Sequence, residues 1–158
     1  MHAQSNSSTI IVLTGDGPIT PAMASYLSRG IRIAEQEGAE ALIFQLNTPG
    51  GSIDTMTEME QAILASSVPV VVYVAPSGAM AASAGTIVTL SAHVSSMAPN
   101  TTIGAASPVG SQGENLPTTE ELKVKNAMSA IARSLTQRRG PTAQALAVDT
   151  IQKAAAVS

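Results

Sequence analysis

Two glycine-bearing turns hold the residues of this chain that could do chemistry. NTPGGS (residues 47–52) and PSGAMAASAG (residues 76–85) each follow a short apolar run. In acyl transfer, backbone N–H groups stabilise the developing oxyanion, and a glycine leaves its amide unshielded by a side chain. Gly51 can supply one such amide. Either turn alone could equally reflect the freedom of glycine to form tight turns, so the functional interpretation rests on both turns together.

Ser83 is the candidate nucleophile in the second turn. Only alanines and a glycine surround it, so no bulky side chain would obstruct a carbonyl group that approaches its hydroxyl. The N–H of Ala84 would be the second oxyanion donor, because the free amides and the dipole of a helix start favour negative charge. Alternatively, Ser83 is a small residue at a tight contact between helix and sheet. The local sequence leaves both interpretations open.

The general base for Ser83 has to come from a short set of candidates. The chain has two histidines, His2 and His93. His93 lies toward the far end of the helix that is predicted to begin near Ser83, so a structural or solvated role is expected and a Ser-His-Asp triad is disfavoured. A lysine can accept the serine proton only when neutral, which requires its pKa to fall from about 10.4 toward neutrality in an apolar site.

The candidate lysines are Lys123, Lys125 and Lys153, and helical spacing separates the first two, which lie on one predicted helix. The apolar stripe of this helix consists of Val124, Met128, Ile131 and Leu135. The two lysines flank the stripe on opposite sides, so only one of them can face the cleft. The flank of Lys123 carries small uncharged residues and that of Lys125 carries Arg139. Although most lysines are solvated surface charges, the uncharged flank is the better place to desolvate an amine, which favours Lys123 as the base.

The elements that position these residues alternate between strands and helices. Strands are predicted at residues 9–13, 41–46, 70–74, 94–97 and 101–103, and helices at 21–37, around 56–63, and at 82–90, 118–140 and 142–157. This alternation predicts a largely parallel sheet, whose ligands gather at the carboxyl ends of the strands. Residues 105–117 are rich in Gly, Ser and Pro and form a candidate mobile lid.

Composition sets limits on function. The 158 residues fit one domain, taken as residues 9–158 after a disordered tail at 1–8, and the natural protein is expected to continue beyond the C-terminus. The net charge of −3 without a basic cluster argues against nucleic acid and anionic membrane surfaces. The absence of cysteine and the low histidine count exclude a thiolate nucleophile and a Cys- or His-rich metal site. No metal or organic cofactor is expected.

Three segments, NTPGG, VYVAPSGAMAASAG and SSMAPNTTIGAASPV, resemble in order and spacing the ClpP-class peptidase domain of the NfeD family. The resemblance implies an α/β ClpP/crotonase-like fold, a spiral of β-β-α units. Asn47 departs from the family, which often has Asp there. The implied site residues are the catalytic pair Ser83 and Lys123, the latter three residues before Asn126, the oxyanion donors of Gly51 and Ala84, and Gly50 and Ser52 for substrate binding.

The resemblance also implies a function. It points to a serine endopeptidase with a Ser-Lys dyad that cleaves apolar segments of membrane proteins, with a stomatin-like protein as a possible partner. The chain would be an extracytoplasmic soluble domain of a membrane protein and a homodimer or higher homo-oligomer. Two alternatives are a crotonase-like acyl-CoA enzyme, which would need an acidic base and a basic phosphate site in the cleft, and a non-enzymatic membrane-complex scaffold that retains a fossil site.

Overall fold

The computed structural model describes residues 8–110 and 113–158, so most of the predicted N-terminal tail and residues 111–112 of the predicted loop lie outside the described residues. The main sheet is parallel and has the order β1-β2-β3-β5. Its strands are β1 (Ile10–Asp16), β2 (Ala41–Asn47), β3 (Val70–Val74) and β5 (Val94–Met97). A smaller sheet consists of β4 (Met80–Ala82), β6 (Thr102–Gly104) and β7 (Ala156–Val157), with β7 antiparallel to β6.

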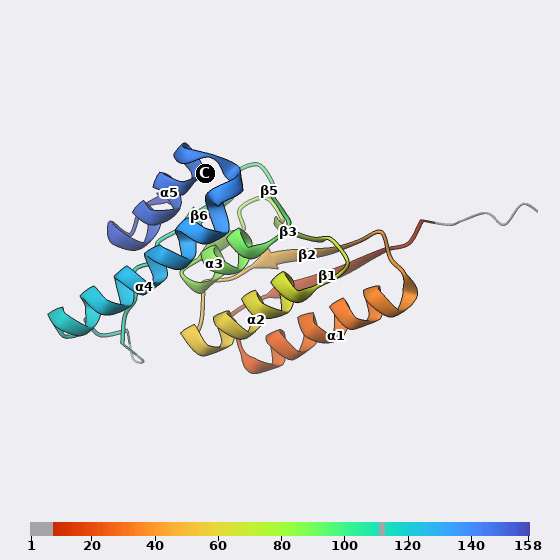
Figure 1. Cartoon of the computed structure of the whole chain (residues 1–158), viewed down its shortest axis with the longest axis horizontal. Helices are drawn as coiled ribbons and strands as arrows, with labels where there is room; N and C mark the ends of the chain where they lie inside the picture. Colours follow the sequence, from red (N-terminus) through yellow and green to blue (C-terminus); the bar gives the residue numbers. More distant parts are fainter. Residues whose placement is uncertain (1–7, 111–112) are drawn as a thin grey trace, which may run out of the picture.

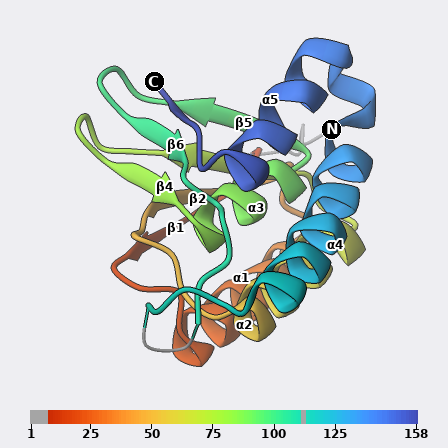
Figure 2. The same cartoon turned by 90° about the vertical axis from the view of Figure 1, so that its left-hand side faces the viewer.

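Three helices cover one face of the main sheet, and two more pack beside them (Figure 1). The covering helices are α1 (Pro21–Glu37), α2 (Ile53–Ala65) and α3 (Ala84–Ser91). The helix α4 (Thr118–Thr136) continues through a 3-10 turn, η1 (Gln137–Arg139), into α5 (Pro141–Gln152). Figure 2 shows α4 running along the same side of the molecule as α2. No helix in the described ranges is long and apolar enough to cross a bilayer.

Local sequence signals fix the helix that follows the first glycine turn. The hydroxyl of Ser52 accepts a hydrogen bond from the N–H of Thr55 at 3.2 Å, which caps the start of α2. Met56, Met59 and Ile63 recur at helical spacing and are buried. The N-terminus of α2 is thereby held directly after Gly51.

The alternating pattern of the main sheet places its core on the helix side. Leu42, Phe44 and Leu46 of β2 are fully buried, whereas the intervening residues are partly exposed. On the opposite face, Ile10, Val12 and Val94 are 51%, 60% and 55% exposed. Nothing in the described part of the chain covers this face, which is unusual because parallel sheets are normally covered on both sides.

The chain repeats a β-β-α unit, as the resemblance implied. The elements β3, β4 and α3 form one unit, and β5, β6 and α4 form another. Isolated parallel bridges between Ile19 and Gly51 and between Thr48 and Ala81 extend the smaller sheet toward the first two helices. The predicted parallel arrangement of the main sheet is confirmed.

The C-terminal helix prediction was wrong at its end. It was expected to run from 142 to 157, but α5 ends at Gln152, and Ala156 and Val157 form β7 instead. Alanine favours helices, yet pairing with β6 overrides this weak local preference. The chain turns back through Ala154, whose φ is +52°. The strand β4 was also missed, because its three small or flexible residues carry no β-branched signal.

The described parts of the predicted loop at residues 105–117 have no regular secondary structure before Thr118. Its beginning is anchored to α5. The N–H of Ala106 donates to the carbonyl oxygen of Thr150 at 2.8 Å, and the hydroxyl of Ser107 donates to that of Ile151 at 2.6 Å. The first residues of this segment are therefore fixed in place and bring Ala106 to the site described next.

Candidate active site

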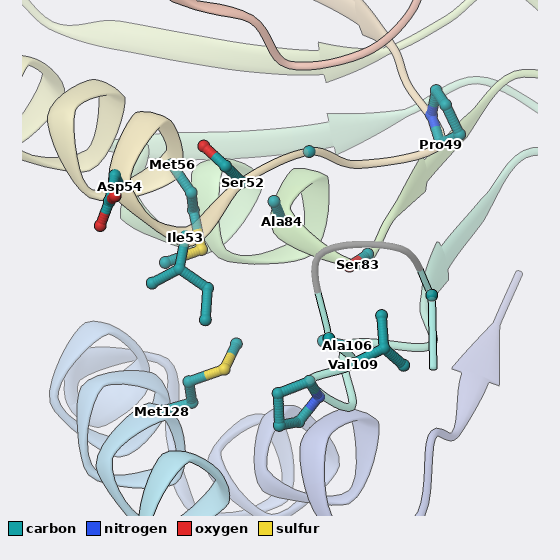
Figure 3. A pocket seen from close by; sticks show the side chains of 14 residues that line it. Pro49, Ser52, Ile53, Asp54, Met56, Ser83, Ala84, Ala106, Val109 and Met128 are labelled. Carbon is teal, nitrogen blue, oxygen red and sulfur yellow. The ribbon is translucent and has the colours of Figure 1, made fainter. Parts of the chain in front are cut away.

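A cavity of about 620 Å³ opens where the two glycine turns meet. Figure 3 shows it between α2, the start of α3, the segment after β6 and α4. Its position after β2 and β4 agrees with the expectation that the site lies at the carboxyl ends of strands. The lining residues are Pro49, Gly51, Ser52, Ile53, Asp54, Met56, Ser83, Ala84, Ala106, Pro108, Val109, Gly110, Gly113 and Met128.

Ser83 lies immediately before α3 in a strained backbone conformation. Its φ is +53° and its ψ is −122°, values that a non-glycine residue rarely adopts. Such a residue costs about 1–3 kcal/mol and persists only when its surroundings hold it. Its N–H donates to the carbonyl oxygen of Gly104 at 2.9 Å, and its own carbonyl accepts from the N–H of Thr86 at 2.9 Å. Strain of this kind is concentrated at functional sites.

Gly50 brings the first turn into contact with Ser83. Its φ is +112°, and a β-carbon built there would lie 2.6 Å from Cβ of Ser83 and 3.2 Å from its Oγ. The turn is fixed by two further bonds: the N–H of Gly50 donates to the hydroxyl of Thr48 at 3.1 Å, and its carbonyl accepts from the N–H of Ile19 at 2.8 Å. Only a glycine fits this position with Ser83 where it is.

Two backbone donors predicted for the oxyanion border the cavity. Gly51 and Ala84 both line it, and neither N–H donates to any other described residue. Ala84 is the first residue of α3, where a backbone N–H has no acceptor within the helix. Free amides at a helix start are suited to a developing negative charge. Ser52 also lines the cavity, but its hydroxyl is used to cap α2.

The cavity wall opposite these amides is apolar. Met56 and Met128 are buried, and Ile53 and Val109 are exposed at its mouth. Figure 3 shows the side chains of Ile53 and Met128 pointing toward one another across the space between α2 and α4. Such a wall can accommodate an apolar side chain next to Ser83.

Asp54 is the one ionisable side chain among the described residues that line the cavity. It is exposed, lies in the first turn of α2, and points away from Ser83 in Figure 3. A carboxylate in the first turn stabilises a helix through its dipole. Sequence reasoning did not single out this residue, although its position two residues after the capping Ser52 is a typical signal for that helix-stabilising role.

The structure does not place Lys123 beside Ser83. Lys123 is exposed on α4 and is not among the lining residues, and the small-residue flank that was expected to face the cleft is exposed as well. The buried residues of α4 are Met128, Ser129, Ala132 and Thr136, because the helix packs on both α5 and α3. The buried stripe is thus rotated from the predicted one toward the flank of Lys125.

Lys125 is engaged elsewhere. Its side chain is 17% exposed, and its Nζ lies 2.7 Å from Oε1 of Glu121 and 3.5 Å from the carbonyl oxygen of Gln152. Lys123, in contrast, forms no hydrogen bond or ion pair with another described residue. The two lysines of α4 therefore differ in environment, but neither touches the cavity.

The structural role expected for His93 is confirmed. The side-chain Nδ1 of His93 accepts a hydrogen bond from the N–H of Val70 at 3.1 Å. The backbone N–H of His93 donates to the carbonyl oxygen of Val70 at 3.0 Å. Val70 is the first residue of β3, so these bonds lie at the amino end of the strand. The cavity is at the opposite, carboxyl end of the sheet, which leaves His93 remote from Ser83.

Asn47 ties three strands together below the site, a role that sequence reasoning missed. Its Nδ2 donates to Oδ1 of Asp16 at 2.9 Å, and its Oδ1 accepts from the N–H of Met80 at 3.0 Å. An amide can donate and accept at once, whereas an ionised carboxylate only accepts. Asn at this position can therefore donate to Asp16 and accept from Met80 at the same time, which an ionised Asp could not do.

The comparisons with known proteins agree with this arrangement. A family model described as "NfeD1b, N-terminal domain" matches residues 10–156. The membrane-bound protease PH1510 of Pyrococcus horikoshii is 44% identical over 128 residues, which cover 80% of this chain and 29% of that protein. The membrane protein NfeD1b of Bacillus subtilis is 34% identical over 113 residues, which cover 72% and 25%. The chain thus spans less than a third of the length of these relatives.

Solved structures share the fold. The 1510-N membrane-bound stomatin-specific protease, in a lysine-to-alanine form with a substrate peptide, matches with a TM-score of 0.87 and 37% identity, over 97% of this chain and 70% of that one. A serine-to-alanine form of the same protease matches with a TM-score of 0.86 and 38% identity, over 96% of this chain and 73% of that one. ClpP1 of Listeria monocytogenes, at 16% identity, matches with a TM-score of 0.72 over 93% of this chain and 82% of that one. The fold is therefore ClpP-like, as the sequence implied.

Proposed function

The chain belongs to the family of NfeD1b N-terminal domains, and on this premise we propose that it is the protease domain of a membrane-bound serine endopeptidase. The observation that carries the proposal is Ser83, a strained residue at the start of α3 that lines a cavity with two free backbone donors. PH1510 of Pyrococcus horikoshii supports it, since it is a membrane-bound protease by name and its 1510-N part was solved as a protease with a substrate peptide.

In the proposed reaction, the hydroxyl of Ser83 attacks the peptide carbonyl and the N–H groups of Gly51 and Ala84 bind the oxyanion. The base, Lys123, takes the serine proton and gives it to the leaving amine, which departs as the acyl-enzyme forms. Lys123 then takes a proton from water, which attacks the ester, and returns that proton to Ser83. Peptide and water are consumed, and two shorter peptides leave.

Lys123 has to move to play this part. Of residues 118–123, only Glu121 is partly buried, and Leu122 is 56% exposed, so little packing holds the first turns of α4 in place. The solved relatives support a serine and a lysine, since each was replaced in one of the two mutant forms. Along the sequence of that protease, the replaced serine and lysine are separated by one position more than Ser83 and Lys123, and by one position fewer than Ser83 and Lys125. The spacing therefore does not discriminate between the two lysines, and the reason to prefer Lys123 is that its amine has no partner among the described residues.

The apolar wall supports a substrate with apolar side chains near the cut peptide bond. Segments of this kind occur in membrane proteins, and the solved relative is named as specific for stomatin. We therefore propose an apolar segment of a membrane protein, such as a stomatin-like protein, as substrate and partner. Gly50 and Ser52 would border the bound peptide from the first turn, and the domain would act on the extracytoplasmic side.

The acyl-CoA alternative finds less support. A CoA thioester carries phosphates whose charge is matched by basic side chains, and no Lys, Arg or His is among the described lining residues. The carboxylate base that this alternative requires would have to be Asp54, whose side chain points away from Ser83. The scaffold alternative predicts an unreactive serine, so it can be decided by experiment.

The test is labelling with a fluorophosphonate, followed by peptide mapping. We expect labelling at Ser83 and none in Ser83→Ala, which should also lose peptide hydrolysis. The variant should melt close to the parent, because it removes one hydroxyl from a site already lined by alanine. Absence of labelling in the parent would favour the scaffold, and hydrolysis by Ser83→Ala would exclude this nucleophile.

A homo-oligomer is proposed as well, with a second copy of the chain on the open face of the main sheet. Ile10, Val12 and Val94 are exposed there, and none of the outward-facing residues at 10–14, 41–45, 71–73 and 94–96 is charged. Asp16, at the carboxyl end of β1, is the one charged residue that faces outward on these four strands, so two copies of the face bring little like charge together. Sedimentation should show an assembly for the parent and for the control Leu64→Asp, an exposed site on α2, but a monomer for Val12→Asp. A monomeric parent would refute this interface.

A further inference from the structure

Thr86 lies three residues after Ser83 and is almost fully buried, with 1% of its surface exposed. Its hydroxyl oxygen lies 3.0 Å from the carbonyl oxygen of Ala81, 2.9 Å from that of Gly104, and 3.1 Å from the backbone nitrogen of Gly104. A hydroxyl has one proton and two lone pairs. It therefore donates to one of the two carbonyls at a time and accepts from the N–H of Gly104.

These three contacts surround the strained residue. Ala81 belongs to β4, two residues before Ser83, and Gly104 ends β6, so the hydroxyl joins both strands to the first turn of α3. The carbonyl of Gly104 is also the acceptor for the N–H of Ser83, and the N–H of Thr86 donates to the carbonyl of Ser83. The N–H of Ser83 is thus held by Gly104, which contacts the hydroxyl of Thr86, and the carbonyl of Ser83 is held by the backbone N–H of Thr86.

The bond from Gly104 has no ready replacement. Gly104 is buried with a φ of +133°, and a β-carbon there would lie 2.2 Å from the carbonyl oxygen of Ala155. Its backbone is thus pressed against the segment that leads into β7, and its N–H points to Thr86. Without the hydroxyl, a buried N–H would be left without a partner, and the strand would shift to satisfy it.

We propose that Thr86 is a positioning residue that keeps Ser83 in its left-handed conformation and so sets the direction of the attacking hydroxyl. It acts through the backbone and touches no substrate. The inference rests on the proposed function where it concerns catalysis, but the backbone conformation of Ser83 can be measured whether or not the chain is a protease.

Thr89 provides a matched control on the same helix. It is equally buried at 1%, and its hydroxyl donates to the carbonyl oxygen of Gly85 at 2.8 Å, within α3. Thr86→Val and Thr89→Val remove the same group from the same helix, but only the first removes contacts to β4 and β6. Thr86→Ser keeps the hydroxyl and should rescue the effect.

Two readouts are measured on all variants. The first is the rate of fluorophosphonate labelling at Ser83 together with kcat and KM for an apolar peptide. Thr86→Val should lower the labelling rate and kcat by about tenfold or more with KM little changed, because misdirection of the nucleophile affects the chemical step. Thr89→Val and Thr86→Ser should stay within a few-fold of the parent. Equal rates in Thr86→Val and Thr89→Val would overturn the proposal.

The second readout is independent of activity. The amide of Ser83 should lose hydrogen-exchange protection, and its three-bond HN–Hα coupling should change, in Thr86→Val but not in Thr89→Val. An unchanged Ser83 amide in Thr86→Val refutes the positioning role even if the parent proves unreactive. Should Thr86→Val fail to fold, Thr86→Cys offers a thiol that donates weakly, and it should show the same changes to a smaller degree.

Discussion

Replacement of Gly50 by alanine tests the contact between the two turns most directly. The added β-carbon would lie 2.6 Å from Cβ of Ser83 and 3.1 Å from the carbonyl oxygen of Ala82. Carbon atoms that are not bonded approach to about 3.5–4.0 Å, so Ser83 or the turn has to move by about 1 Å. A displacement of about 1 Å at a reacting group can cost about 100-fold in rate. We expect Gly50→Ala to be labelled by a fluorophosphonate about 100-fold more slowly than the parent.

Gly17 supplies the control for backbone strain. Its φ is +106°, close to the +112° of Gly50, and a β-carbon there meets no atom within 4 Å. Both alanine variants should lose about 1–3 kcal/mol of stability from the unfavourable backbone, which lowers the melting temperature by about 2–4 °C for each kcal/mol in a domain of this size. Only Gly50→Ala should also lose reactivity.

The assay compares second-order labelling rates and melting curves of the parent and the two variants at one pH and temperature. If Gly50→Ala reacts within a few-fold of Gly17→Ala, the close approach of the first turn to Ser83 does not control reactivity. Slow labelling in both variants would show that general loss of stability, and not the contact with Ser83, lowers the rate.

The remaining predictions concern charged residues. Lys123→Ala should lose peptide hydrolysis without a change in melting temperature. Lys125→Ala should keep hydrolysis and lose about 0.3–0.5 kcal/mol of folding stability, because its ion pair with Glu121 is removed. The opposite pattern in the activity assay would reverse the assignment of the base. Hydrogen bonds from the N–H and hydroxyl of Ser67 lower the pKa of Glu35 below 4.5, so its contribution to stability is present above about pH 4.5 and disappears as the pH falls through the folded-state pKa. The gap in melting temperature between the parent and Glu35→Gln should therefore be larger at pH 7 than at pH 3, and a constant gap would contradict this linkage.

Local signals explain how much of the fold could be predicted from sequence. Thr20, Pro21 and Gly38 mark the ends of α1, and the structure has the helix at Pro21–Glu37, with the Thr20 hydroxyl accepting from the N–H of Met23. The meeting of the two glycine turns followed from a rule of topology, since the carboxyl ends of neighbouring parallel strands lie at one edge. Both inferences need only residues close in sequence or a general property of parallel sheets.

The contacts that hold Ser83 could not be predicted in the same way. The strand β7 exists because Ile103 and Gly104 pair with residues more than fifty positions later, and Ala156 and Val157 show no strand pattern of their own. The hydroxyl of Thr86 joins segments whose neighbourhood depends on that pairing. Spacing along the chain carries no information on such contacts.

The position of Lys123 shows what helical spacing can predict and what it cannot. Spacing correctly placed Lys123 and Lys125 on different flanks of α4, but which flank is covered depends on α5, which buries the side of Lys125 near Gln152. Ser83 is held from both sides by buried bonds, whereas the proposed base lies at the exposed end of a helix with little packing. The apolar wall of the cavity connects the surroundings of Ser83 to the helix of the proposed base, because Ile53 comes from α2 and Met128 from α4. A peptide that fills the space between these side chains would contact α4 directly, and this contact is the simplest means by which substrate binding could draw the lysine toward the serine.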